Sequence, residues 1–319
     1  MPILRRITNL FTRGQLQREI DSELRSHIEM RIEDNLAAGM SRREARRDAL
    51  VRFGSRDAMH ERTAEADAAL VLESLWTDLR YVYTTGSTNA DVAAAARAGA
   101  AEGLVVIADE QTAGRGRLDR QWTSPPAAGI ALSVLLRPAR ANIPTSRYGQ
   151  LPLLAGVALA ESMRRLGDVD AVLKWPNDLL IDDRKCAGVL SETVPPDGSV
   201  VVGIGLNVTL REAELPRADA TSLQLAGSSC VDRDPLVRAL LRSLAEWYER
   251  WRDAGGDPDR SGLMEAYRFH CGTIGRSVRV ELPGGAEISG MATSVDNDGC
   301  LIVAGRNIAA GDVVHLRSQ

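Results

Sequence analysis

The feature that most constrains the fold of this chain is an alternation of strand-like and helix-like segments between residues 76 and 270. Six apolar runs there have the length of strands, at residues 104–108, 129–136, 171–175, 179–181, 188–191 and 200–208. Helix-like patterns occupy residues 90–98, 151–166 and 235–254. Strands and helices interleaved in this way predict an α+β domain built around a mixed sheet.

The sequence changes character after residue 270. Apolar residues alternate with polar or charged ones at Val278, Val280 and Leu282. Turn signals follow at residues 283–285 and 296–299, with apolar residues again between and after them. Short strands at close spacing, separated by such turns, predict a small β-barrel at the C-terminal end.

The N-terminal segment is rich in Arg and Glu and contains no strand-like run. Four apolar side chains recur at intervals of four residues, at Leu24, Ile28, Ile32 and Leu36. This spacing predicts an amphipathic helix that Gly39 ends, and Ser41 with Glu44 predicts the start of a second helix that stops at Gly54. We expect a helical hairpin, which is either a solvated appendage or a surface for a partner. The three patterns divide the chain into residues 1–75, 76–270 and 271–319.

Composition and charge exclude several classes of protein. The net charge of −4 gives the chain as a whole no attraction for nucleic acid or anionic lipid, so we expect neither DNA nor a membrane as partner. The longest nearly apolar run, residues 151–160, is too short to cross a bilayer. Four scattered cysteines argue against a structural zinc site and predict a reducing, cytoplasmic location.

Lysine is almost absent from this chain. Of its 39 basic Lys and Arg residues, only Lys174 and Lys185 are lysines, and both lie in the segment from residue 173 to 188. An ammonium is a compact point charge, whereas a guanidinium is a flat fork, so the two are not interchangeable at a demanding site. Two lysines so close together indicate a functional segment.

A second signal is the loop Gly114-Arg115-Gly116-Arg117, which follows the predicted strand 104–108. Glycine lets the backbone approach a ligand closely, and successive backbone amides can form an anion-binding concavity. Guanidinium groups interleaved with them can donate in pairs to phosphate or carboxylate oxygens. The loop therefore predicts a site for an oxyanion, such as a polyphosphate.

From about residue 79 to its C-terminus the chain resembles a biotin protein ligase. Five motifs in sequence order carry the resemblance: Gly86-Ser87-Thr88-Asn89; Glu110 to Arg117 with Arg120 and Trp122; Lys174-Trp175-Pro176-Asn177-Asp178; Arg184 to Glu192; and Gly203 to Val208. One departure is visible, because Asp119 stands where the family loop has a third glycine. The resemblance implies a biotin/lipoate ligase-like catalytic domain and an SH3-like C-terminal domain.

The resemblance also implies the activity. Biotin's carboxylate would attack the α-phosphate of ATP, with Mg²⁺, to give biotinyl-5′-adenylate and pyrophosphate. The biotinyl group would then pass to a specific lysine of a biotin carboxyl carrier protein, in acetyl-CoA carboxylase or a related carboxylase. Charge that builds on the α-phosphate needs positioned cations.

The resemblance implies a role for each motif residue. The catalytic residues are expected to be Lys185, Arg117 and Asp178. The biotin-binding residues are expected to be Ser87, Thr88, Asn89, Gln111, Gly114, Arg115, Gly116, Arg117, Lys185, Gly203 and Gly205. The nucleotide-binding residues are expected to be Arg115, Arg117, Arg120, Trp122, Asn177, Lys185 and Asn207, with Mg²⁺ held mainly by the ATP phosphates, near Asn177.

Several of these residues have a plainer interpretation. Thr88 is predicted to cap the following helix, and glycines in a strand, as at Gly203, often mark close approach by a ligand. Asn177 and its neighbour Asp178 are equally compatible with an Asx turn that bonds local backbone. Trp122 is either a wall of the site or a core residue. Similarly, Lys174 is either a cation facing the ligand or a structural partner of an acid, and we favour a structural or auxiliary role.

Two other functions use the same motifs or fold. A bifunctional ligase and biotin-operon repressor needs a DNA-reading helix-turn-helix ahead of the ligase domain. The charges of the first seventy residues nearly cancel, and no winged strand pair follows them, so we expect a ligase alone. A lipoate or octanoyl transferase shares the fold, but the Gly-Arg-Gly-Arg loop and the Lys-Trp-Pro-Asn-Asp segment favour biotin. The sequence leaves a homodimer and the identity of the carrier open.

Overall fold

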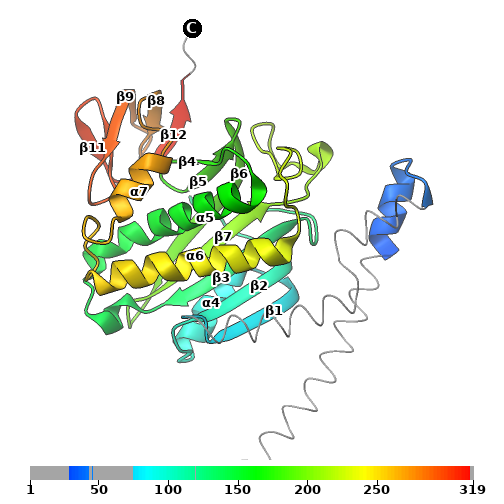
Figure 1. Cartoon of the computed structure of the whole chain (residues 1–319), viewed down its shortest axis with the longest axis horizontal. Coiled ribbons are helices and arrows are strands. Elements are labelled where there is room, and N and C mark those ends of the chain that lie inside the picture. The colour runs from blue at the N-terminus through cyan, green and yellow to red at the C-terminus, as the bar shows by residue number, and fades with distance from the viewer. Residues whose placement is uncertain (1–28, 43–44, 46–74, 119, 317–319) are drawn as a thin grey trace, which may run out of the picture. The chain divides into compact units, whose positions relative to one another are not determined.

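The computed structural model describes residues 29–42, 45, 75–118 and 120–316. Two compact units are present, Met1–Ala68 and Ala69–Gln319. The second unit contains every motif of the site, and its elements run from β1 to β12 (Figure 1). The predicted boundary at residue 270 lies inside this unit, between α7 and β8, and stays a prediction.

A seven-stranded mixed sheet forms the centre of the second unit, in the order β1-β2-β3-β7-β6-β5-β4. Its strands are β1 (Asp78–Thr85), β2 (Leu104–Gln111), β3 (Gly129–Leu136), β4 (Val172–Lys174), β5 (Asp178–Ile181), β6 (Arg184–Val194) and β7 (Ser199–Asn207). Only β1 and β2 pair in parallel, and all other neighbours are antiparallel. The six predicted strands are all present, and the mixed sheet of the predicted α+β fold is confirmed.

Helices cover both faces of this sheet (Figure 1). The helix α4 (Thr88–Arg97) packs Val92, Ala93 and Ala96 against Leu104, Val106, Leu135 and Val201. The opposite face, which carries Val105, Leu132 and Val202, packs against α5 (Leu151–Gly167) and α6 (Arg233–Asp253). Strands apolar on both faces are typical of a sheet buried between two helical layers.

The long helices follow their sequence signals. In α5, Pro152 stands in the first turn, where its missing N–H costs nothing, and Asp168 ends the helix in the left-handed region. In α6, the side chain of Asp232 accepts a hydrogen bond from the backbone N–H of Asp234, which caps the helix. Their apolar faces pack on each other and on the sheet, so they fix the sheet edge on which the site is built.

The C-terminal strands form a second sheet, in the order β11-β10-β9-β8-β12. They are β8 (Ser277–Glu281), β9 (Glu287–Val295), β10 (Leu301–Val303), β11 (Arg306–Ile308) and β12 (Asp312–His315), all paired antiparallel. This is the predicted SH3-like domain. Its buried residues, such as Val280 and Leu301, belong to the same apolar cluster as α5 and α6.

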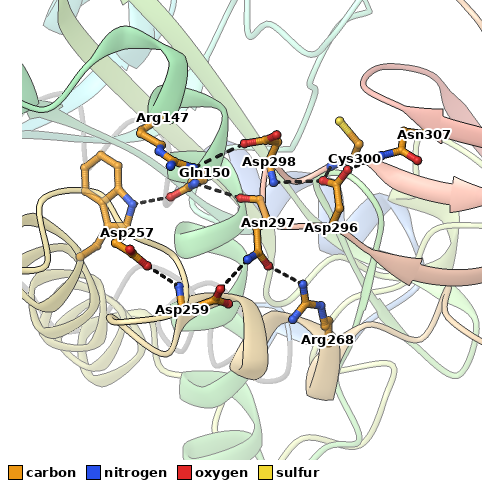
Figure 2. Close-up of polar contacts among 11 residues, drawn as sticks. Arg147, Gln150, Asp257, Asp259, Arg268, Asp296, Asn297, Asp298, Cys300 and Asn307 are labelled. Carbon is orange, nitrogen blue, oxygen red and sulfur yellow. Dashed lines mark hydrogen bonds and ion pairs between the residues drawn. The ribbon is translucent and has the colours of Figure 1, made fainter.

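A network of polar contacts holds the turn at residues 296–299 against the rest of this unit (Figure 2). Arg268 of α7 (Leu263–His270) donates to the backbone carbonyl of Val295 and to the side chain of Asn297. Gln150 donates to the carbonyl of Asn297 and accepts from the indole of Trp251. These bonds fix the second sheet relative to the first, and therefore fix the position of β12 beside the site.

The first unit contributes one described helical segment, residues 29–37. Gly39, with φ of 87°, follows it, and the N–H of Met40 donates back to the carbonyl of Asn35, as predicted for a glycine-ended helix. Leu24, Ile28 and most of the predicted second helix lie outside the described residues. None of the described helices is both long and apolar enough to cross a membrane.

Four elements and one cap differ from the sequence prediction. The edge strand β1, the short helix α7 and the last two strands, β11 and β12, were not predicted. The cap of α4 is Ser87 and not Thr88, because Thr88 already has helical geometry. The Ser87 side chain makes no capping hydrogen bond, and the Thr88 N–H instead donates to the Gln111 side chain. The carboxylate of Asp91 accepts from the hydroxyl of Thr85 and does not close a capping box.

Candidate active site

A cavity of about 1390 Å³ is lined by residues of both sheets. Its lining comes from the start of α4, the loop after β2, the strands β5 to β7, and β12. Every predicted site residue lines it except Gly114. The structure therefore brings together residues that lie more than a hundred positions apart in the sequence.

The side chain of Asn89 forms the floor of one end of the cavity. Its carboxamide oxygen accepts from Ser133 Oγ at 2.6 Å, and its nitrogen donates to the carbonyl of Leu190 at 3.4 Å and to Glu192 Oε2 at 2.7 Å. Asn89 is only 5% exposed, and Ser133 is fully buried. All the described bonds of the Asn89 side chain are to protein, so it shapes the floor and does not offer a free donor.

The side chains of Thr88 and Gln111 extend this floor. The N–H and hydroxyl of Thr88 donate to Gln111 Oε1 at 2.8 and 3.1 Å, and Ser133 Oγ lies 2.7 Å from the Thr88 hydroxyl. The Ser87 hydroxyl and the amide nitrogen of Gln111 have no hydrogen-bond partner among the described residues and line the cavity. These two groups are therefore available to a polar ligand beside the start of α4.

The glycines of β7 are required by side chains that lie across the strand. A Cβ at Gly203 would lie 2.0 Å from Asn89 Oδ1, and one at Gly205 would lie 2.4 Å from the indole of Trp122. Close approach is present at both positions, where Asn89 and Trp122 are the approaching side chains, and both glycines also line the cavity. Trp122 is half-buried and lines the cavity, so it is a wall and not a core residue.

The Gly-Arg-Gly-Arg loop folds against the second sheet. Arg117 donates to Asn177 Oδ1 at 3.1 Å and to the carbonyl of Gly311 at 3.4 Å, and Arg120 forms an ion pair with Asp312 of β12. Burial lowers the pKa of Arg117, and the negative charge of Asp312 opposes this change. Asp119 lies outside the described residues.

Gly114 lies at the base of the loop, outside the cavity lining. Its carbonyl accepts from the backbone N–H of Trp122 at 2.9 Å, and a Cβ on it would lie 2.3 Å from the carbonyl oxygen of Trp122. Glycine at this position therefore lets the two arms of the loop approach each other. Arg115 pairs with Gln121 in the same way, as an isolated antiparallel bridge.

Lys185 and Asp178 form an ion pair at the centre of the cavity. Lys185 Nζ lies 2.6 Å from Asp178 Oδ1 and 5.9 Å from the centre of the Trp122 ring. The backbone of Lys185 is fixed by the carbonyl of Asp219 and the N–H of Thr221. A cation held against an apolar wall and a carboxylate is a suitable partner for a ligand anion.

The two asparagines of the site are held by distant backbone. The amide nitrogen of Asn177 donates to the carbonyl of Val189 at 2.8 Å, and that of Asn207 donates to the carbonyl of Thr221 at 2.9 Å. The alternative of an Asx turn at Asn177 and Asp178 is therefore wrong. Both asparagines belong to the cavity lining.

A group of basic side chains occupies the far end of the cavity, next to β12. Burial lowers the pKa of Lys174, and the charge of Lys185 lowers it further, while Asp178 and Asp219 raise it. Burial, with Lys174 and Arg276 nearby, lowers the pKa of His315 to about 4. The structure places Lys174 on the ligand side, because it lines the cavity.

The donor set for a metal is small. Among the described residues, no three His, Cys, Asp or Glu side chains gather closely enough to hold an ion. Mg²⁺ usually keeps several waters and binds one or two carboxylates together with substrate phosphates. Asp178 fits that mode, whereas Asn177 Oδ1 is already engaged by Arg117.

Comparison with known proteins agrees with this geometry. Residues 82–209 match the biotin/lipoate A/B protein ligase family, and residues 273–316 match the biotin protein ligase C-terminal domain. The chain is 44% identical over 250 residues to a biotin--[acetyl-CoA-carboxylase] ligase of Mycobacterium tuberculosis, covering 76% of this chain and 90% of that protein. The chain belongs to the biotin protein ligase family.

Other relatives of this ligase-family chain support the assignment. A bifunctional ligase/repressor BirA of Bacillus subtilis is 32% identical over 246 residues, covering 75% of this chain and 73% of that protein. The structure of a biotin protein ligase from Aquifex aeolicus in complex with biotin and ATP aligns with a TM-score of 0.63 at 26% identity. That alignment covers 76% of this chain and 100% of that chain.

Three residues of the site were missed by reasoning from the sequence, namely Ser133, Asp312 and His315. Ser133 lies inside a predicted apolar strand, where a single hydroxyl gives no signal. Asp312 and His315 belong to the second sheet, and no pattern in the sequence predicts that this sheet lies beside the loop. Glu192 is the last residue of the motif Arg184 to Glu192, but only the structure shows that its two partners are Asn89 and Arg115.

Proposed function

We propose that this chain ligates biotin to a lysine of a biotin carboxyl carrier domain, using ATP and passing through biotinyl-5′-adenylate. One observation carries the proposal. A single cavity joins a neutral, hydrogen-bonding end at α4 to a cationic end that contains Lys185, Arg117 and Lys174. A bicyclic ureido ring requires the first end, and the carboxylate and phosphates require the second.

In the first step a biotin carboxylate oxygen attacks the α-phosphorus of ATP. The bond from the α-phosphorus to the bridging oxygen breaks, and pyrophosphate leaves with that oxygen. Lys185 and Arg117 are proposed to stabilise the charge that builds on the α-phosphoryl oxygens. Because Arg117 is partly buried and Lys185 is held by Asp178, the cations are in place before the substrate arrives.

In the second step a carrier lysine attacks the acyl carbon of the adenylate. An amide bond forms, AMP leaves, and the amine loses a proton. Asp178 is proposed to orient the amine and accept this proton, because it is the carboxylate that lies within 2.6 Å of Lys185 at the reacting end. Asp178 would hold Mg²⁺ together with the ATP phosphates, and the metal would supply further neutralisation of phosphate charge.

The neutral end of the cavity at α4, which is the ring end, favours biotin over lipoate. Its open polar groups are the Ser87 hydroxyl and the Gln111 amide nitrogen, both beside the polar floor formed by Asn89. A ureido group can bond to these positions, whereas a dithiolane ring would leave them unpaired. An unpaired buried polar group costs about 1–3 kcal/mol, which is enough to disfavour the lipoyl substrate.

The proposal is tested by incubating the protein with ATP, Mg²⁺, biotin and a biotin carrier domain. The intact mass of the carrier should increase by one biotinyl group, and pyrophosphate should appear only when biotin is present. Lipoate or octanoate in place of biotin should give no increment. A carrier that gains mass from lipoate but not from biotin would overturn the proposal.

The partners and location follow from the same proposal. We propose action as a ligase alone, in the cytoplasm, where ATP is available and the four cysteines, free in the structure, would stay reduced. Absence of a gel shift with biotin-operon DNA, in the presence of biotin and ATP, is the expected result. Sedimentation with and without these ligands would decide between a monomer and a homodimer.

A further inference from the structure

We propose that Glu192 is a positioning residue that connects the floor of the ring end to Arg115 of the Gly-Arg-Gly-Arg loop. This inference rests on the proposed function. Glu192 Oε2 accepts a hydrogen bond from Asn89 Nδ2 at 2.7 Å and forms an ion pair with Arg115 Nη2 at 3.1 Å. One carboxylate oxygen thus bonds both to Asn89, on the floor of the ring end, and to Arg115, in the Gly-Arg-Gly-Arg loop.

Glu192 fixes the orientation of the Asn89 carboxamide. The oxygen of that amide faces the hydroxyl of Ser133 on β3, and the nitrogen faces the carbonyl of Leu190 and the carboxylate of Glu192 on β6. A flipped amide would place its oxygen against two acceptors. A carboxylate accepts hydrogen bonds and cannot donate them, so it excludes the flipped state more strongly than a neutral group would.

The absence of a side chain at Gly203 makes this arrangement possible. Gly203 lies on β7 between Ser133 on β3 and Leu190 on β6 in the strand register. Because a Cβ there would lie 2.0 Å from Asn89 Oδ1, only glycine allows the carboxamide to bridge the three strands. The carboxylate of Glu192, at the end of this bridge, therefore completes a floor that the register of the sheet has prepared.

Glu192 also determines the position of the Arg115 guanidinium. The backbone of Arg115 is held by the bridge with Gln121, but the described partner of its side chain is Glu192 alone. The Arg115 side chain is 48% exposed and that of Glu192 32% exposed, so the pair lies at the cavity wall. A guanidinium has five N–H donors, and the pair leaves most of them available to an anion in the cavity.

The consequence is a link between the two halves of the substrate. A ring that settles on the Asn89 floor stabilises the Glu192 carboxylate in place, and that carboxylate holds Arg115 beside the acyl-phosphate group of the bound adenylate. Without Glu192 the floor amide loses its charged acceptor and Arg115 loses its partner. The affinity of the protein for biotin should therefore decrease, and biotinyl-adenylate should be released faster.

The experiment compares the full-length protein with two variants at position 192. Glu192→Ala removes both bonds, and we expect a rise in the biotin Kd of about tenfold, together with faster adenylate release. Glu192→Gln keeps an acceptor for Asn89 but removes the charge, so the biotin Kd should change less than about twofold, while adenylate release accelerates up to about fivefold. Release of biotinyl-adenylate is measured without carrier.

A double-mutant cycle separates positioning from general destabilisation. If Glu192 acts on the adenylate through Arg115, Glu192→Gln should change the release rate little in an Arg115→Ala background. Equal acceleration in both backgrounds would overturn the inference, as would a Glu192→Ala protein with wild-type biotin affinity and release. Failure of the wild-type protein to form adenylate would instead overturn the proposed function.

Asp197→Asn is the matched control. Asp197 also accepts from a side-chain hydroxyl, Ser199 Oγ at 2.6 Å, and pairs with an arginine, Arg137, but it lies outside the cavity lining. We expect it to lower the melting temperature while leaving biotin affinity and adenylate release unchanged. If this variant changed the two site measurements as Glu192→Gln does, stability and not position would explain the effect, and the inference would fail.

Discussion

At the end of the cavity nearest α4 the polar side chains are mostly neutral and bond to one another. The floor made by Thr88, Asn89 and Ser133 is buried, and its bonds run between neighbouring strands and the helix. At the end nearest β12 the side chains are charged and pair across elements that are distant in sequence, as Arg120 does with Asp312. One end is assembled by the sheet, and the other by the contact between the two sheets.

The difference shows how one cavity can bind a neutral ring and a polyanion. Neutral groups can be buried at low cost if each is hydrogen-bonded, as Thr88, Asn89 and Ser133 are. Cations require partners, and here those partners are carboxylates such as Asp178 and Asp312. A ligand anion must share or replace these partners. The side chains of the cationic end nearest β12, the anion end, should therefore change position on ligand binding more than those of the ring end.

The largest effect should come from Lys185→Ala, which removes the central cation of the anion end. A cation used chiefly in the transition state lowers the rate when removed, and we expect biotin-dependent pyrophosphate release to decrease about a thousandfold. Lys185→Arg should rescue little, because a planar fork does not replace a point charge.

Biotin binding serves as the control for this variant, since its ring end is intact. The biotin Kd should change far less than the rate, and the melting temperature should stay close to that of the wild type. Pyrophosphate release at the wild-type rate would show that the anion end does not depend on Lys185.

The next effect tests the ring end. In Gly203→Ala the new methyl group would displace the Asn89 carboxamide, which lies 2.0 Å from the site of the Cβ, and would break its bonds to Ser133 and Glu192. We expect the biotin Kd, measured by calorimetry, to rise at least about tenfold. Gly149→Ala is the control, because its Cβ would meet no atom within 4 Å. An unchanged Kd in Gly203→Ala would mean that the floor does not contribute to binding.

A smaller effect is expected from Asp119→Gly in the loop of the anion end. An aspartate there repels the adenylate phosphate or diverts a neighbouring arginine, so its removal should slow the release of biotinyl-adenylate about threefold. Glycine also raises the entropy cost of ordering the loop by about 0.5–1 kcal/mol, which limits the gain. Faster release from the variant would show that Asp119 helps to hold the loop closed.

The anion end should also affect stability at low pH. The pKa of His315 is about 4 in the folded protein, because of burial and of the charges on Lys174 and Arg276, against about 6.5 in an unfolded chain. Between these values the unfolded chain binds the extra proton, so stability decreases as the pH falls through this window. Since His315 is partly exposed, we expect a contribution of about 1 kcal/mol.

Urea unfolding at pH 7 and pH 5 measures this contribution. His315→Gln should lose less stability between the two pH values than the wild type does. Equal losses would show that His315 is not the residue responsible.

The smallest effect should follow deletion of residues 1–70, which contain none of the motif residues. All motif residues belong to the unit Ala69–Gln319, so carrier biotinylation should continue within about twofold of the full-length rate. The rates are compared by intact mass at equal concentrations of folded protein. A soluble but inactive truncation would assign the first unit a role in the site or in assembly.

Local sequence signals correctly predicted many of the secondary-structure elements of this protein. Apolar runs located six of the seven strands of the central sheet, and the signal at Gly39 located a helix end. The strand β1 was missed because its Arg and Thr residues interrupt the apolar pattern, and α7 because it is short and carries the exposed Phe269. Motif order predicted the residues that gather in the cavity, since chemistry at a ligand requires particular side chains.

Only the tertiary structure decided how those residues hold one another. The sequence predicts close approach by a ligand at Gly203, and only the register of β3, β6 and β7 shows that Asn89 also lies against this glycine. Likewise, the contact between the two sheets makes Asp312 the partner of Arg120. Sequence patterns report the environment along one element, whereas hydrogen bonds and ion pairs between elements depend on register and packing. These arise only when the distant segments meet.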